Sequence, residues 1–163
     1  MKDRFTLFRR TIAAFCAAVI ALAALPGVAQ DRTVPYWASI KVDEMYMRVG
    51  PSQNYKVSWV YKRKGLPLKV VRVIEGWRLV QDHEGTQGWV SVGLITAKRS
   101  AMVTGKGLAA MRDAPADNGR LKWNAEPGVV GTLGECEAGW CSLDVGGKVG
   151  WVRAERLWGA GEP

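Results

Sequence analysis

Side chains that commonly carry catalysis are scarce in this chain of 163 residues. His83 is its only histidine, and it lies in the polar stretch 82–85, which is typical of a solvated turn. Of the three cysteines, Cys16 falls in an apolar N-terminal run, while Cys136 and Cys141 lie close together near the other end. If Cys16 is lost with the N-terminal segment and the last two are bonded to each other, no thiolate remains to act as a nucleophile beside His83. We therefore predict a protein that is not an enzyme and needs no cofactor.

A metal site is not expected either. Its ligands would be Cys136, Cys141 and His83, which would have to meet from distant parts of the chain. Acidic pairs such as Asp43 with Glu44 occur in turn-like stretches, where solvated carboxylates are the ordinary case. The composition favours binding instead, because the chain has eight tryptophans and a formal net charge of +8.

Trp140 is one candidate for a stacking surface. Alternate side chains of a β-strand face opposite ways, so if Leu143 and Val145 point into a core, Trp140 points outward. Two interpretations stay open. The indole ring either stacks on a sugar ring or peptide of a ligand, or it is covered by the other copy or by the end of the chain.

A duplicated sequence positions these aromatic residues. The segment GWRLVQDHEGTQGWV at 76–90 returns as GWCSLDVGGKVGWV at 139–152. Trp77 thereby corresponds to Trp140, and Met47-Arg48 corresponds to Met111-Arg112. This near-constant spacing predicts two copies of one structural unit, each with a β-hairpin framed by tryptophans.

The two C-terminal cysteines are predicted to form a disulfide. Cys136 and Cys141 flank four residues, a spacing that places them opposite each other across a tight hairpin. The first copy has Val73 and Arg78 at the matching positions, so we expect the crosslink only in the second copy. For so short a loop, the chain-entropy model gives about 2 kcal/mol of stabilisation.

Residues 1–29 have the layout of a secretory signal peptide. Basic residues up to Arg10 precede the uncharged apolar run 12–25, and the small-residue pattern Gly27-Val28-Ala29 follows. The run is shorter than the roughly 20 residues needed to span a bilayer. We expect a signal-peptide helix that is removed on export, a mature chain without a transmembrane span, and a periplasmic location. An uncleaved anchor is the alternative.

Basic residues crowd one region of the first copy: Lys62, Arg63, Lys64, Lys69, Arg72 and Arg78. They form either a solvated charged face or a surface that attracts an acidic partner through its long-range field. Basic residues among aromatics often indicate nucleic-acid binding, but export argues against it. Peptidoglycan carboxylates, anionic lipid head groups or an acidic envelope protein fit the expected compartment better.

Short β-rich runs separated by Gly and Pro turns predict an all-β protein. No sustained 3.6-residue apolar period with capping signals occurs after Ala29. We expect two tandem small β-barrels, at 36–96 and 101–159. The join at 96–100 is too short for a flexible linker, so the copies should lie against one another.

Several stretches of both copies are familiar as a set. The first copy contains the motif Tyr46 to Ser52, the run Trp59 to Arg63 and the hairpin 82–90; the second contains Pro127 to Val130 and Gly150-Trp151-Val152. Together they resemble the bacterial SH3 domain family, in particular the exported tandem form of Gram-negative bacteria. The resemblance covers nearly all of the chain after the leader. It implies non-catalytic, SH3-like barrels of five or more strands. Related domains of wall-associated proteins bind peptidoglycan or its peptides.

The resemblance also implies a binding groove, since SH3-type folds hold extended ligands between aromatic side chains. With the two hairpin tryptophans, the candidate ligand-binding residues are Tyr46, Arg48, Tyr55, Trp59, Tyr61, Trp77 and Trp140. Met47 and Met111 are expected in the core instead.

The predicted function is that of an exported, non-catalytic module that recognises peptidoglycan or its peptides. The alternative is a protein-interaction adaptor at the envelope, in which one copy binds an acidic partner protein and the other braces it. A wall hydrolase is the third hypothesis.

Overall fold

The computed structural model describes residues 32–163, which form one compact unit. The signal peptide predicted for residues 1–29 lies outside the described residues. Within 32–163 the helical elements are two 3-10 helices of three residues each, η1 (Val92–Leu94) and η2 (Ala154–Arg156). All other regular structure there is strand, so the all-β expectation is confirmed. In this part of the chain, no helix is long and apolar enough to cross a membrane.

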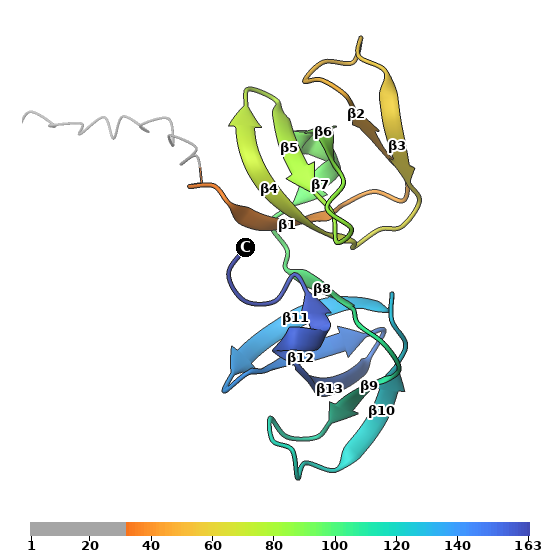
Figure 1. Ribbon diagram of the computed structural model, residues 1–163, viewed down its shortest axis with the longest axis vertical. Helices are drawn as coiled ribbons and strands as arrows, with labels where there is room; N and C mark the ends of the chain where they lie inside the picture. The colour runs from red at the N-terminus through yellow and green to blue at the C-terminus, as the bar shows by residue number, and fades with distance from the viewer. Residues whose placement is uncertain (1–31) are drawn as a thin grey trace, which may run out of the picture. The chain divides into compact units, whose positions relative to one another are not determined.

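The first sheet has seven strands in the order β3-β2-β6-β5-β4-β1-β7 (Figure 1). They are β1 (Tyr36–Ile40), β2 (Met45–Arg48), β3 (Val57–Tyr61), β4 (Pro67–Ile74), β5 (Trp77–Gln81), β6 (Gln87–Ser91) and β7 (Ile95–Thr96). Neighbouring strands pair antiparallel. Because β3 ends the sheet, only its β2 side has a hydrogen-bonded neighbour.

The second sheet repeats this order with every strand number raised by seven: β10-β9-β13-β12-β11-β8-β14. Its strands are β8 (Ser100–Val103), β9 (Ala109–Arg112), β10 (Leu121–Ala125), β11 (Val130–Glu137), β12 (Trp140–Val145), β13 (Lys148–Arg153) and β14 (Leu157–Trp158). The identical order confirms the prediction of two tandem SH3-like barrels. β10 here takes the place of β3 at the end of the sheet.

Alternating side chains give each barrel its own apolar core. In the first barrel Met45 and Met47 of β2 face inward and are fully buried, together with Val90 of β6. In the second barrel Met111 and Val152 take the corresponding places. The expectation that Met47 and Met111 lie in the core is confirmed.

A glycine of each sheet lies directly against the core methionine. A Cβ built on Gly88 would lie 2.5 Å from Met47 Cγ and 3.1 Å from Arg48 O. A Cβ built on Gly150 would lie 2.9 Å from Met111 Cβ and 3.2 Å from Arg112 O. Only a residue without a side chain lets β6 approach β2, and β13 approach β9, this closely.

The disulfide between Cys136 and Cys141 is present, as predicted. The two cysteines are cross-strand partners in the β11–β12 hairpin, whose turn holds Ala138 and Gly139 at positive φ. In the first barrel Val73 and Arg78 are paired in the same way without a crosslink.

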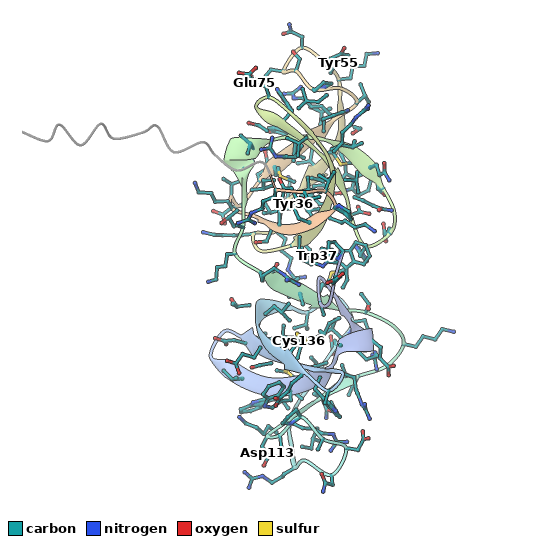
Figure 2. The ribbon with its side chains drawn as sticks, turned by 90° about the vertical axis from the view of Figure 1, so that its left-hand side faces the viewer. Tyr36, Trp37, Tyr55, Glu75, Asp113 and Cys136 are labelled. Atoms are coloured by element: carbon teal, nitrogen blue, oxygen red, sulfur yellow. A yellow bond between two sulfur atoms is a disulfide. The ribbon has the colours of Figure 1, made fainter. Side chains whose placement is uncertain are left out.

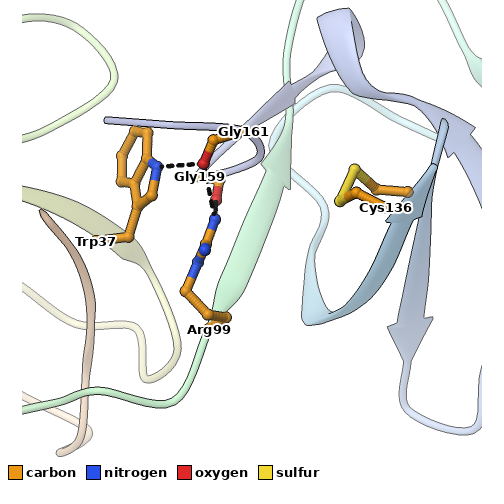
Figure 3. The surroundings of a disulfide bond; sticks show 6 residues. Trp37, Arg99, Cys136, Gly159 and Gly161 are labelled. Carbon is orange, nitrogen blue, oxygen red and sulfur yellow. Dashed lines mark hydrogen bonds between the residues drawn. A yellow bond between two sulfur atoms is a disulfide. The ribbon is translucent and has the colours of Figure 1, made fainter. Parts of the chain in front are cut away.

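The barrels contact each other through β1 and the C-terminal segment. Trp37 meets Trp158 edge to face, with ring centroids 5.0 Å apart, and its Nε1 donates a hydrogen bond to Gly161 O at 3.1 Å. Arg99, in the join, donates from Nη2 to Gly159 O at 2.6 Å. Figure 3 shows both hydrogen bonds. The barrels therefore lie against one another, as the short join predicts.

We predict that Gly88→Ala and Gly150→Ala each destabilise the protein by about 1–3 kcal/mol, because the added methyl overlaps a buried methionine and nearby backbone. Urea denaturation followed by far-UV circular dichroism measures the change. Gly93→Ala is the matched control, since nothing lies within 4 Å of its added Cβ and its φ is not left-handed. Equal stabilities of Gly88→Ala and Gly93→Ala would contradict the close approach of β6 to β2.

Reduction of the disulfide is expected to lower the Tm of the second barrel, through a loss of about 2 kcal/mol. Cys136→Ser should have the same effect and leave the amide signals of the first barrel in their folded positions. Calorimetry with and without reductant measures the Tm, and two-dimensional NMR follows the amide signals of the first barrel. Two freely titrating thiols in the native, unreduced protein would refute the crosslink.

Candidate functional site

The outer edge of β3 is the most exposed aromatic surface among the predicted residues. Val57, Ser58, Trp59 and Val60 line a shallow hollow of about 330 Å³, and Trp59 is 52% exposed. Because β3 has a neighbour only on its β2 side, backbone N–H and C=O groups of its other edge lack a strand partner. The edge can therefore accept another extended chain.

Tyr46 and Trp59 do not share a groove, contrary to the prediction. Side chains that are directly opposite on paired strands share a face. Tyr46 is opposite Val60, whereas Trp59 is opposite the buried Met47. The phenol of Tyr46 and the indole of Trp59 thus belong to opposite faces of the β2–β3 ribbon.

Tyr61 is a core residue and not a ligand contact, which corrects a second expectation. Its side chain is buried, and its hydroxyl donates to Asp82 Oδ2 at 2.7 Å. Asp82 is buried too, and its Oδ1 accepts from the backbone N–H groups of Glu84 and Thr86 at 3.0 and 2.9 Å. Burial, and then the hydrogen bond to Asp82, raises the pKa of Tyr61 well above its ordinary value. The pair fixes the β5–β6 turn to the end of β3.

Arg48 and Tyr55 lie together. Arg48 Nη1 donates to Tyr55 O at 2.7 Å, and the Tyr55 ring covers Gly50, where a Cβ would lie 2.6 Å from it. Tyr55 lies at the end of the first barrel away from Trp37 (Figure 2). Nearby on β2, Tyr46 donates to the Glu44 carboxylate at 2.6 Å, and this hydrogen bond raises the pKa of Tyr46.

The six residues of the predicted basic patch lie in different environments. Arg63 Nη1 donates to Gly128 O of the second barrel at 2.7 Å. Lys69 Nζ lies 5.7 Å from the ring centroid of Trp158, also in the second barrel. These two cations brace the contact between the barrels and do not form a free surface.

The other predicted cations also differ from one another. Arg78 Nε donates to Tyr36 Oη at 2.9 Å, on the partly buried side of β5. Lys62 Nζ lies 3.7 Å from a Glu44 carboxylate oxygen. Lys64 and Arg72 are exposed. The six residues therefore do not make up one uniformly exposed cationic surface.

Trp140 is 4% exposed and offers no free stacking surface. The guanidinium of Arg153 covers its ring, 4.4 Å from the centroid. Trp140 is thus covered by Arg153 of its own barrel, whereas the second interpretation places the other copy or the end of the chain over it. Its counterpart Trp77 is half-buried on β5.

A cavity of about 250 Å³ adjoins Trp140 on the second barrel. Ala110, Arg112, Asp117 and Arg153 contribute to its lining. No motif in the sequence points to this cavity directly, but two differences between the copies do. Tyr46 directly precedes Met47, whereas the smaller Ala110 directly precedes Met111. Ser91 lies opposite Trp77, whereas Arg153 lies opposite Trp140.

Among the described residues, His83 belongs to the β5–β6 turn, whereas Cys136 and Cys141 are bonded to each other in the β11–β12 hairpin. His83 is exposed in the β5–β6 turn, with Nε2 3.9 Å from Glu84 Oε1. Between residues 32 and 163, no three or more His, Cys, Asp or Glu side chains gather as they would to hold a metal ion.

Two copies of one antiparallel barrel, each with an exposed end strand, define a tandem of small SH3-like modules. The family model described as bacterial SH3 domain matches residues 41–96 and 105–159, and the chain belongs to this family.

Similar proteins include several that are larger. The "Putative N-acetylmuramoyl-L-alanine amidase YrvJ" of Bacillus subtilis (strain 168) is 25% identical over 134 residues, which are 76% of this chain and 26% of that protein. The chain thus spans about a quarter of the length of this curated relative. NlpC1 from Trichomonas vaginalis is 10% identical over 79% of this chain and 47% of its own, with a TM-score of 0.34. An NlpC/P60 family protein from Bacillus cereus ATCC 10987 is 13% identical over 76% and 56%, with a TM-score of 0.35.

We predict that Asp82→Ala destabilises the first barrel by about 2–3 kcal/mol, because the buried Tyr61 hydroxyl and two turn N–H groups lose a charged acceptor. Tyr61→Phe should cost less, since it removes one donor and leaves the turn bonds of Asp82 in place. Thermal unfolding measures both. If Tyr61→Phe were less stable than Asp82→Ala, the Asp82 carboxylate would not be the main acceptor that holds the turn and Tyr61 together.

Proposed function

We propose that this protein is a non-catalytic binding module that attaches to cell-wall peptidoglycan by its peptides, in the periplasm. The observation that carries the proposal is the exposed outer edge of β3, with Trp59 at its centre. An extended peptide can add to such an edge as a further strand, so that main-chain hydrogen bonds supply affinity and side-chain contacts supply specificity.

The side chains along β3 suit peptidoglycan peptides. Trp59 offers an apolar face for stacking on a peptide or a sugar ring, and Val57 widens that apolar surface. Lys56 precedes the strand and Lys62 follows it, so a cation stands at each end. Peptidoglycan peptides carry free carboxylates, which these ammonium groups attract.

The relative from Bacillus subtilis supports the same class of ligand. It is named as a putative N-acetylmuramoyl-L-alanine amidase, and N-acetylmuramoyl-L-alanine is a unit of peptidoglycan. Attachment to the wall is the property that we propose for the shared region, because the match covers only 26% of that protein.

Export is part of the proposal. The layout of residues 1–29 is that of a signal peptide, and the Cys136–Cys141 disulfide suits an oxidising compartment such as the periplasm.

Sedimentation with purified peptidoglycan at low salt tests the proposal. We expect the protein to be retained, and Trp59→Ala to weaken retention about tenfold, as loss of a central aromatic contact does. Trp123→Ala is the matched control, because Trp123 has the same place on β10 but lies under Lys148, 5.3 Å from its ring centroid. Equal retention of the two variants, or no retention of the native protein, would contradict the proposal.

An envelope adaptor is the second candidate, favoured by the same strand edge, since a segment of a partner protein can pair with it as well. Crosslinking in envelope extracts followed by purification would favour the adaptor if one stoichiometric protein partner appeared and peptidoglycan retained nothing. A wall hydrolase is the third. If the purified chain released soluble fragments from purified peptidoglycan, the result would support the hydrolase and contradict the non-catalytic proposal.

A further inference from the structure

The cavity beside Trp140 differs from the β3 edge, because it is concave and lies on the other barrel. Its volume of about 250 Å³ falls a little below the roughly 300 Å³ at which pockets for drug-sized ligands begin. It therefore suits a small group, of the size of one amino-acid residue.

Three arginines line this cavity against two acids, so its net charge is positive. Arg156 is held by backbone carbonyls, with Nε at 2.8 Å from Thr104 O and Nη2 at 2.9 Å from Gly107 O. Arg112 Nη1 donates to Gly119 O at 2.7 Å, and its Nε is buried without a hydrogen-bond acceptor. No carboxylate of the described residues is bonded to Arg112, so its charge is available to an anion in the cavity.

Arg153 already holds a carboxylate. Its guanidinium is stacked on Trp140, which fixes its plane, and its Nη2 donates to both carboxylate oxygens of Asp117. The Asp117 side chain belongs to the loop between β9 and β10 and is 78% exposed. An ion pair this exposed is held weakly, so another carboxylate can replace Asp117 on Arg153. Figure 2 shows Asp113, at the start of this loop, at the end of the second barrel.

The first barrel lacks this arrangement. The residue opposite Trp77 is Ser91, whereas the residue opposite Trp140 is Arg153. The larger Tyr46 precedes Met47 where Ala110 precedes Met111. The second copy therefore combines a small residue that leaves space with an arginine that supplies charge.

We infer that this cavity is a second binding site, which takes the free carboxylate of a short peptide, with Asp117 occupying the carboxylate position until the ligand arrives. The choice of a peptidoglycan peptide as the source of that carboxylate rests on the proposed function, whereas the site itself does not. Arg153 binds the carboxylate, Arg112 adds its unpaired charge, and Trp140 keeps Arg153 in place.

Titration of the full chain with N-acetyl-D-alanyl-D-alanine, followed by the NMR signal of the Trp140 indole N–H, tests the inference. We expect saturable shifts, and binding at least about tenfold weaker for the C-terminal amide, which lacks the charge that strengthens the arginine contacts. Arg153→Gln should weaken binding about tenfold for the same reason. Asp117→Asn should strengthen binding about two- to fivefold, because it removes a weakly held competitor.

Lys41→Gln is the control, since it removes one exposed positive charge from the first barrel and should leave the titration unchanged. Equal binding of acid and amide, or weaker binding to Asp117→Asn, would overturn the inference. If acetate bound as tightly as the dipeptide, the peptide would not be the source of the carboxylate. If inorganic phosphate bound as tightly, the preference for a carboxylate would be overturned.

Arg153→Lys retains a positive charge, so its affinity for the dipeptide should lie between those of the native protein and Arg153→Gln. Retention on peptidoglycan lost in Trp59→Ala with the dipeptide titration intact would separate this site from the proposed function.

Discussion

The contact between a buried methionine and a glycine is the constraint on which both barrels depend. Met47 against Gly88, and Met111 against Gly150, bring the second strand of each sheet onto the sixth and close the core between them. The tryptophan that follows each glycine is paired with the arginine that follows each methionine. The apolar closure thus also sets the positions of Arg48 and Arg112, the second of which lines the cavity beside Trp140.

The barrels share this closure but are braced by different chemistry. In the first, the buried Asp82 accepts hydrogen bonds from Tyr61 and from its own turn. In the second, Ala125 stands at the place of Tyr61, and the Cys136–Cys141 bond braces another hairpin of the sheet. A duplicated fold can therefore keep its strand order while its polar and covalent supports diverge. Both copies keep an open end strand, and the same divergence adds a concave, cationic cavity to the second copy.

Much of the fold could be predicted from the sequence, because duplicated landmarks and the cysteine spacing report local geometry directly. The face of the sheet on which each candidate side chain lies could not be predicted. Tyr46 and Trp59 lie on opposite faces because of the β2–β3 register, in which Tyr46 is opposite Val60 and Trp59 is opposite Met47. A bulge between Met47 and Arg48 interrupts this register, and no residue pattern predicts it. The division of the basic patch follows from packing between the barrels, which sends Arg63 and Lys69 to the second barrel. Trp140 is covered because β13 places Arg153 opposite it, a pairing that depends on strand register and not on composition.

The contact of the C-terminal segment with Trp37 and Arg99 has a consequence for avidity. Tandem modules on a flexible linker can adjust to ligands at many separations, whereas modules clamped together hold two binding surfaces at one spacing. On the two proposed surfaces, a polymer whose repeating groups match that spacing would engage both at once, and a polymer with another spacing would engage one. The few residues after Trp158 would then influence which polymer binds best, because they hold the barrels at a fixed separation.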